Sequence, residues 1–139
     1  EDINGHDLPD TLRIVASTQT PNGAFDTQAE TRLRDIMSTQ VGVIRNGEDL
    51  ASAVRSLVAM ERSATNAALR NMATTALIVA TAAWVRQESR GAHFRSDYPD
   101  ENPALARRTM TTLNAAHAVA ATITGHEATR AAVPADALS

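Results

Sequence analysis

Apolar residues recur at helical spacing in the stretch from about residue 28 to residue 44. Side chains three or four positions apart lie on one face of a helix. The apolar residues of this face are Leu33, Ile36, Met37, Val41 and Ile44. Thr27 and Glu30 have the spacing of a capping box, in which each side chain accepts a hydrogen bond from an unpaired backbone amide. The pattern therefore predicts a first helix that begins at Gln28.

A second apolar stripe follows at the same spacing. It consists of Leu50, Val54, Leu57, Val58 and Met60. Asn46 is a residue type that caps helices, and Glu48 and Asp49 would lie in the first turn, where the helix dipole favours negative charge. We predict a second helix that begins after Asn46 and ends near Ser63.

The third stretch, Ala67 to Ser89, has apolar residues on more than one side, which predicts a helix buried by several neighbours. Its many alanines allow close helix packing. Gly91 is the residue expected to end this helix, because glycine adopts positive φ at little cost. Pro99 and Pro103 oppose immediate resumption of a helix.

The rest of the chain has weaker patterns. We expect a fourth helix over Ala104–Ala121, although the threonines around Met110 and Leu113 would also suit an extended segment. Residues 1–26 are predicted to be a linker, with a short extended piece at residues 12–15. Residues 27–124 are predicted to form the helical domain, and residues 125–139 a flexible tail. The expected fold is all-α, a spectrin-like up-down-up three-helix bundle with an irregular C-terminal extension.

Composition narrows the possible functions. The 139 residues suit one domain, and with 43% hydrophobic but only 3% aromatic residues they favour packed helices over a β-sandwich. A net charge of -3 argues against nucleic-acid binding, and the absence of cysteine excludes disulfides, thiol catalysis and zinc–thiolate sites. The longest apolar run, Ala76–Val85, is about half of the ~20 residues that a membrane span needs. We expect a cytoplasmic protein without a membrane partner.

Polar residues gather after the third predicted helix, where Arg90, His93, Arg95 and Asp97 follow one another closely. A histidine paired with an aspartate can act as a general acid or base. The alternative is structural: these side chains satisfy helix-end carbonyls and one another, with Glu88 as an arginine partner. We predict the structural role, and no catalytic, cofactor-binding or metal-binding residue in this chain, because a lone histidine among scattered carboxylates lacks a recognised ligand spacing.

Two motifs resemble one enzyme family. Val41-Gly42-Val43-Ile44-Arg45 and Glu88-Ser89-Arg90-Gly91-Ala92-His93 are similar to two strings in the C-terminal helical domain of the succinate dehydrogenase, fumarate reductase and L-aspartate oxidase flavoproteins. Asp97-Tyr98-Pro99 looks more like the L-aspartate oxidase branch. An Arg-Asp-Asp string that succinate dehydrogenases usually carry is absent after Pro99. Glu1-Asp2-Ile3 resembles the end of the flavin domain, so the resemblance implies that the chain begins at a domain boundary and that residues 1–26 are the linker from a missing FAD-binding domain.

The resemblance implies a parent enzyme that uses FAD to oxidise L-aspartate to iminoaspartate on the route through quinolinate to NAD. No glycine-rich dinucleotide motif occurs in this chain, so the isolated chain is expected to bind no FAD and to be inactive. The implied partners are the FAD-binding and capping domains of the same protein, with quinolinate synthase as a possible further partner. The residues expected at the interdomain contact are Glu88, Arg90, Gly91, His93, Arg95, Asp97, Tyr98 and Pro99. The alternatives are the matching domain of a succinate or fumarate flavoprotein and a stand-alone helical interaction module.

Overall fold

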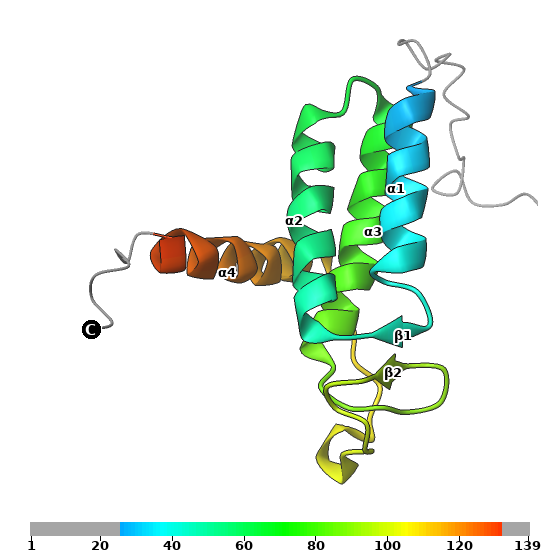
Figure 1. Cartoon of the computed structure of the whole chain (residues 1–139), viewed down its shortest axis with the longest axis vertical. Coiled ribbons are helices and arrows are strands. Elements are labelled where there is room, and N and C mark those ends of the chain that lie inside the picture. Colours follow the sequence, from blue (N-terminus) through cyan, green and yellow to red (C-terminus); the bar gives the residue numbers. More distant parts are fainter. Residues whose placement is uncertain (1–25, 132–139) are drawn as a thin grey trace, which may run out of the picture.

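The computed structural model describes residues 26–131. Helices α1 (Thr27–Thr39), α2 (Gly47–Ser63) and α3 (Ala67–Val85) lie side by side with alternating direction, and α4 (Leu113–Ala131) lies across them (Figure 1). The predicted all-α class and three-helix bundle are therefore confirmed. The predicted linker and the end of the predicted tail lie outside the described residues.

The helix starts follow the expected chemistry with one exception. Asn46 caps α2 by accepting a hydrogen bond from the backbone N–H of Asp49 at 2.8 Å, as predicted, and Asn66 caps α3 in the same way. The predicted capping box at Thr27 is wrong. Asp26 caps α1 instead, because its carboxylate accepts from the N–H of Ala29 at 2.9 Å.

The core lies between α1, α2 and α3. All five residues of the predicted α2 stripe are buried, and Leu50, Val54 and Leu57 are fully so. From α1 and the loop after it, Leu33, Ile36 and Val41 join this core, with Met37 packed at its edge. Ile44 was predicted on the same face and is instead 69% exposed, because α1 ends at Thr39 and helical spacing no longer applies beyond it.

Helix α3 is the central helix of the bundle. It contacts α1, α2 and α4, which explains the apolar residues on more than one of its sides. The small side chains of Ala73, Ala76 and Ala80 are buried against its neighbours. By length and composition alone α3 could cross a membrane, but a core helix of a soluble protein passes the same test. The helix ends at Val85, four residues before the predicted end at Ser89.

The fourth helix was predicted in the wrong place. Only Pro103–Leu105 forms a short 3-10 helix in the first part of the predicted range, and α4 begins at Leu113 and continues past Gly125 to Ala131. Between Leu113 and Gly125 its buried side chains are those of Ala116, Ala120 and Ile123. His117 links α4 to α2 through a 2.9 Å contact with the carboxylate of Glu61.

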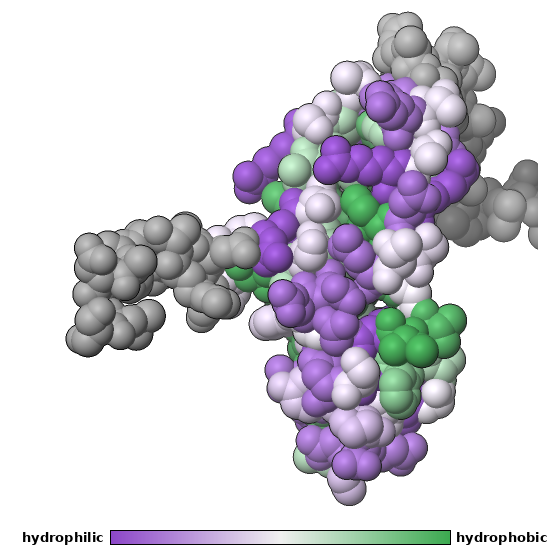
Figure 2. All heavy atoms as spheres, in the orientation of Figure 1, coloured by the Kyte–Doolittle hydropathy of each residue, from purple (hydrophilic) through white to green (hydrophobic). Residues whose placement is uncertain are grey.

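Two very short strands complete the fold. β1 (Ile44–Arg45) pairs in parallel with β2 (Phe94–Arg95), so that Ile44 lies opposite Phe94. No sequence pattern predicted them. Figure 2 shows a hydrophobic area beside these strands, on a face that is otherwise largely hydrophilic. The strands connect the loop between α1 and α2 to the polar segment after α3.

The buried stripe of α2 predicts a large cost for truncation. Leu57→Ala should lower the free energy of unfolding by about 2 to 5 kcal/mol, because it removes buried apolar atoms and leaves a cavity. Met110, which is 89% exposed, supplies the control, and Met110→Ala should change it by less than about 0.5 kcal/mol. Denaturant titration of both variants measures the difference. Equal effects would contradict the assignment of Leu57 to the core.

Candidate functional site

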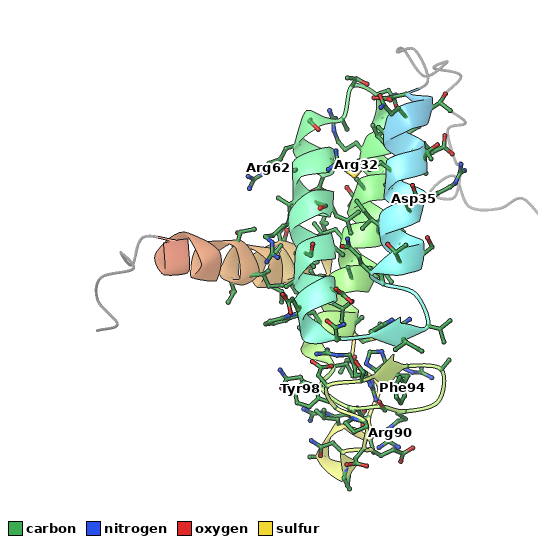
Figure 3. The ribbon with its side chains drawn as sticks, in the orientation of Figure 1. Arg32, Asp35, Arg62, Arg90, Phe94 and Tyr98 are labelled. Atoms are coloured by element: carbon green, nitrogen blue, oxygen red, sulfur yellow. The ribbon has the colours of Figure 1, made fainter. Side chains whose placement is uncertain are left out.

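Residues 86–102, named here the motif turn, leave the end of α3 and contain all eight residues predicted at the interdomain contact. Figure 3 shows Arg90, Phe94 and Tyr98 at the end of the bundle where β1 and β2 lie. The segment folds back on itself through the backbone, because Ser89 N–H donates to the carbonyl of Asp100 at 3.1 Å. The buried Ser89 hydroxyl accepts from the N–H of Arg95 and contacts the Tyr98 carbonyl at 2.8 Å.

Gly91 has positive φ, as predicted, but it does not end α3. Its φ is +57°, and Arg90 and His93 exchange backbone hydrogen bonds of 2.7 and 3.0 Å around it. A glycine with positive φ followed by a residue with negative φ is the arrangement of a type II′ turn. Gly91 therefore closes a tight hairpin within the motif turn.

Arg95 and Asp97 join the ends of two helices. The guanidinium of Arg95 is almost fully buried and donates from Nη1 to the carbonyls of Ala83 and Trp84, both at 3.0 Å, at the end of α3. Its other nitrogens make a two-point ion pair with Asp97 at 2.8 and 2.7 Å. Asp97 in turn accepts from the N–H of Gly47, the first residue of α2, at 2.9 Å. A cation thus caps the negative end of α3 and an anion the positive end of α2.

Gly47 makes this close approach possible. A Cβ atom at position 47 would lie 3.0 Å from the Asp97 carboxylate and 3.2 Å from the Arg95 guanidinium. The hydrogen bond from Arg95, joined by the N–H of Gly47, outweighs burial and lowers the pKa of Asp97 to about 2. The carboxylate is therefore ionised at every physiological pH and does not transfer protons.

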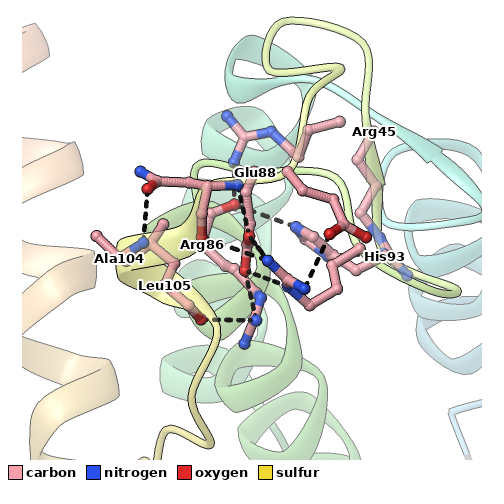
Figure 4. Close-up of polar contacts among 10 residues, drawn as sticks. Arg45, Arg86, Glu88, His93, Ala104 and Leu105 are labelled. Atoms are coloured by element: carbon pink, nitrogen blue, oxygen red, sulfur yellow. Dashed lines mark hydrogen bonds and ion pairs between the residues drawn. The ribbon is translucent and has the colours of Figure 1, made fainter.

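Glu88 is the centre of a second charge cluster, drawn in Figure 4. Its carboxylate is fully buried and receives hydrogen bonds from Arg86, Arg90 and the backbone N–H of Asn102. Burial raises the pKa of Glu88, but these hydrogen bonds outweigh it and lower the pKa to about 2. Arg90 also contacts Glu101 at 3.0 Å. The prediction that Glu88 pairs with a nearby arginine is confirmed.

His93 is held between a guanidinium and a carbonyl. Its Nδ1 lies 3.0 Å from Arg45 Nη1, and its Nε2 lies 3.1 Å from the Arg86 carbonyl oxygen. Arginine can only donate and a carbonyl can only accept, so the geometry requires a neutral imidazole with its proton on Nε2. Desolvation by burial lowers the pKa of His93, and three nearby arginine charges lower it further against the effect of the carbonyl.

These contacts separate the two sequence hypotheses. The catalytic alternative needs Asp97 to orient His93, whereas neither ring nitrogen of His93 contacts Asp97. Instead, Arg95 satisfies helix-end carbonyls and the remaining charged groups satisfy one another, as the structural alternative predicts. Tyr98 and Pro99 are exposed, and the Tyr98 ring lies 5.2 Å from the Arg95 guanidinium carbon. The motif turn is thus a structural connection, and whether it touches another domain stays a prediction.

Sequence reasoning missed three contributors: Gly47, Arg86 and Asn102. A glycine in the first turn of a helix is an uncommon choice and marks close approach by another group. The charge alternates at every second position through Arg86, Glu88 and Arg90. In a non-helical segment this spacing suits a carboxylate that is held by two arginines. Asn102 contributes through its backbone, which leaves no signal in the sequence.

The start of α2 does not fit a phosphate cradle for FAD. β1 leads through Asn46 into α2, but the helix start that would face a phosphate is occupied by the Asp97 carboxylate. Among residues 26–131 there is no group of three or more histidine, aspartate or glutamate side chains placed to hold a metal ion.

An apolar pocket of about 280 Å³ lies between the end of α3, residues 105–111 and the start of α4. Val85, Leu105 and Met110 are among its lining residues. Arg86, the charged residue at its wall, already donates to Glu88 and to the carbonyl of Leu105. The pocket is therefore mainly apolar, and the charged side chain at its wall is already hydrogen-bonded to other groups.

Comparison with known proteins identifies the family. The family described as "Fumarate reductase flavoprotein C-term" matches residues 64–133. The L-aspartate oxidase of Rhodospirillum rubrum is 48% identical over 88 residues, which are 63% of this chain and 32% of that protein. The L-aspartate oxidase of Agrobacterium fabrum is 32% identical over 110 residues, 79% of this chain and 21% of that protein. The fumarate reductase flavoprotein subunit of Helicobacter pylori is 32% identical over 85 residues, 49% of this chain and 12% of that protein.

The chain therefore spans about a third or less of the length of these relatives. No solved structure matches it.

Because Arg95 caps the end of α3, replacing it should lower the stability of the domain. Arg95→Met should lower the free energy of unfolding by about 1 to 3 kcal/mol, because the carbonyls of Ala83 and Trp84 lose their donor and the partly exposed Asp97 carboxylate loses its ion-pair partner. Arg62, which is exposed on α2 and points away from the bundle in Figure 3, supplies a matched control. Arg62→Met should cost less than about 0.5 kcal/mol in the same denaturant titration. If both variants lose the same small amount, Arg95 does not have this role.

The lowered pKa of His93 predicts a pH dependence. The unfolded chain, with an ordinary histidine pKa of about 6.5, binds the proton more tightly than the folded chain does. The free energy of unfolding should therefore decrease as the pH falls below about 6.5 and be fully retained above it. His93→Gln, whose amide can accept from Arg45 and donate to the Arg86 carbonyl, should reduce this decrease between pH 7 and pH 5. Parallel pH profiles for the two proteins would show that His93 titrates normally.

Proposed function

This chain belongs to the family of fumarate reductase flavoprotein C-terminal domains, and from that premise we propose that it is the C-terminal helical domain of an FAD-dependent L-aspartate oxidase. The reaction of the whole protein would be the oxidation of L-aspartate to iminoaspartate, which feeds quinolinate and NAD synthesis. The observation that carries the proposal is the 48% identity to the Rhodospirillum rubrum L-aspartate oxidase. Several further relatives with the same name support it.

Within that enzyme the proposed role of this domain is structural. A catalytic acid or base must be free to exchange a proton with its substrate. The charged groups of the motif turn are instead committed to each other and to helix ends: Glu88 to two arginines, Asp97 to Arg95 and Gly47, and His93 to Arg45 and Arg86. These contacts support a structural role for this domain. On this proposal, flavin binding and catalysis take place in the other domains of the protein.

The proposal includes partners and a location. FAD would bind in the flavin domain of the parent protein, and the FAD-binding and capping domains would be the immediate partners of this chain. Quinolinate synthase, which would consume the unstable imine, is a possible further partner, and the cytoplasm is the proposed location.

A second candidate is a succinate or fumarate flavoprotein. The description of the matching family and the Helicobacter pylori relative favour it. The two candidates differ in substrate, since L-aspartate carries an amino group where succinate carries hydrogen.

Substrate oxidation by the full-length protein decides between them. We expect the purified full-length protein to carry FAD, to bleach its flavin with L-aspartate and to produce peroxide in air, whereas succinate should do neither. Residues 1–139 expressed alone serve as the control and should show no flavin absorbance and no peroxide. Turnover of succinate but not of L-aspartate would favour the second candidate. Stoichiometric flavin on the isolated chain would contradict the structural role.

A further inference from the structure

Three exposed apolar residues lie together beside the two short strands. They are Val43, Ile44 and Phe94, named here the strand patch, and 78%, 69% and 40% of their surfaces are exposed. Ile44 and Phe94 are opposite each other in the parallel pair, so the patch joins segments 50 positions apart in the chain. Figure 2 shows the hydrophobic area, and Figure 3 labels Phe94 within it. Apolar side chains gathered in this way, with polar residues around them, mark a surface that binds another part of a protein.

A positive charge that no carboxylate of the described residues neutralises adjoins the patch. Arg45 is next to Ile44 in β1 and is half-buried. Its Nε donates to the carbonyl of Val41 at 2.9 Å, and its Nη1 donates to His93. Both acceptors are neutral, and no carboxylate within the described residues pairs with Arg45. A surface that covered the patch would need to offer this guanidinium an anion, because a buried unpaired charge is strongly unfavourable.

We propose that the strand patch is the surface on which the flavin-binding part of the same polypeptide docks, through apolar side chains and a carboxylate that pairs with Arg45. This inference rests on the proposed function, because it takes the partner from the parent enzyme. The chain spans 32% or less of the relatives' length, so such a protein has a large further part for this surface to meet.

The charge at Arg45 bears on the two other possible occupants, a second copy of this chain and its N-terminal segment. A contact between two copies of this chain would be two-fold symmetric, so the patch of one copy would meet the patch of the other. The two Arg45 guanidiniums would then approach each other in a partly desolvated interface, where like charges repel. Residues 12–15 of this chain, Leu-Arg-Ile-Val, are also apolar; they carry the cation Arg13 and follow the carboxylate of Asp10, so cross-linking must separate this occupant from the proposed one.

The strand patch lies directly beside the residues that bind the ends of α2 and α3. Phe94 directly precedes Arg95, whose guanidinium caps α3, and Ile44 lies three residues before Gly47, which binds Asp97. The ion pair between Arg95 and Asp97 therefore fixes both halves of the patch to helix ends. On this account the motif turn acts as the rigid support, and the neighbouring apolar residues make the interdomain contact.

Photo-cross-linking in the full-length protein tests the proposal directly. A benzophenone amino acid is placed at position 44, and in a matched protein at position 79, since Val79 is another exposed aliphatic residue but lies on α3. Flavin absorbance is measured on each preparation before irradiation, and cross-linked peptides are then identified by mass spectrometry. We expect position 44 to link to the flavin-binding part of the same polypeptide and position 79 to give at least tenfold less of that product.

Each other outcome overturns the docking proposal in a recognisable way. Links from position 44 to a second copy, to residues 1–25, or to nothing, in a protein that holds its flavin and turns over L-aspartate, would refute the docking surface and leave the proposed function standing. Equal yields from positions 44 and 79 would refute the assignment to the strand patch. A protein without flavin would refute the proposed function and this inference together.

A substitution pair gives an independent measurement. Ile44→Ser should lower the temperature at which the full-length protein releases flavin by about 3 °C or more, because it places a hydroxyl in an apolar contact. Val79→Ser makes the same change at a site outside the patch and should leave that temperature within about 1 °C of the parent. If Ile44→Ser also leaves the temperature unchanged, the patch faces solvent and the proposal is wrong.

Discussion

Two helix ends of opposite polarity meet at one end of this bundle, and a single ion pair satisfies both. The last carbonyls of α3 carry partial negative charge and the first amides of α2 carry partial positive charge. Arg95 binds the former, Asp97 binds the latter, and the two side chains bind each other. The pair comes from neither helix, so the motif turn must stay folded for the helix ends to stay capped.

This constraint accounts for the rest of the polar site. The motif turn can present Arg95 and Asp97 only if its own path is fixed, and Glu88, His93 and the hairpin at Gly91 fix it. The same residue types could have formed a catalytic site elsewhere. In the motif turn, Glu88 and Asp97 each have a guanidinium partner, and His93 lies between Arg45 and the Arg86 carbonyl, so these groups hold the turn in its conformation. These contacts support the structural role that we propose for the domain.

The features that depend on local residue spacing were predicted correctly from the sequence. Those that depend on contacts between distant residues were not. The α2 stripe and the Asn46 cap follow from periodicity and side-chain length, and both are as predicted. The end of α3 is set by Arg95, ten residues beyond Val85, so the glycine at 91 was an attractive but incorrect marker. The strands at Ile44 and Phe94 have two residues each and carry no periodic signal. The structural role of Arg90, His93 and Asp97 was predicted, but their particular partners required the fold.

The central claim is that Arg95 and Asp97 act as one unit between α2 and α3. A double-mutant cycle of Arg95→Met and Asp97→Asn, with the free energy of unfolding as the measured quantity, tests it most directly. A coupled pair predicts that the double variant loses less stability than the sum of the two single variants, by about 1 to 3 kcal/mol. Losses that add to within about 0.3 kcal/mol would show that each side chain acts alone and would contradict the account.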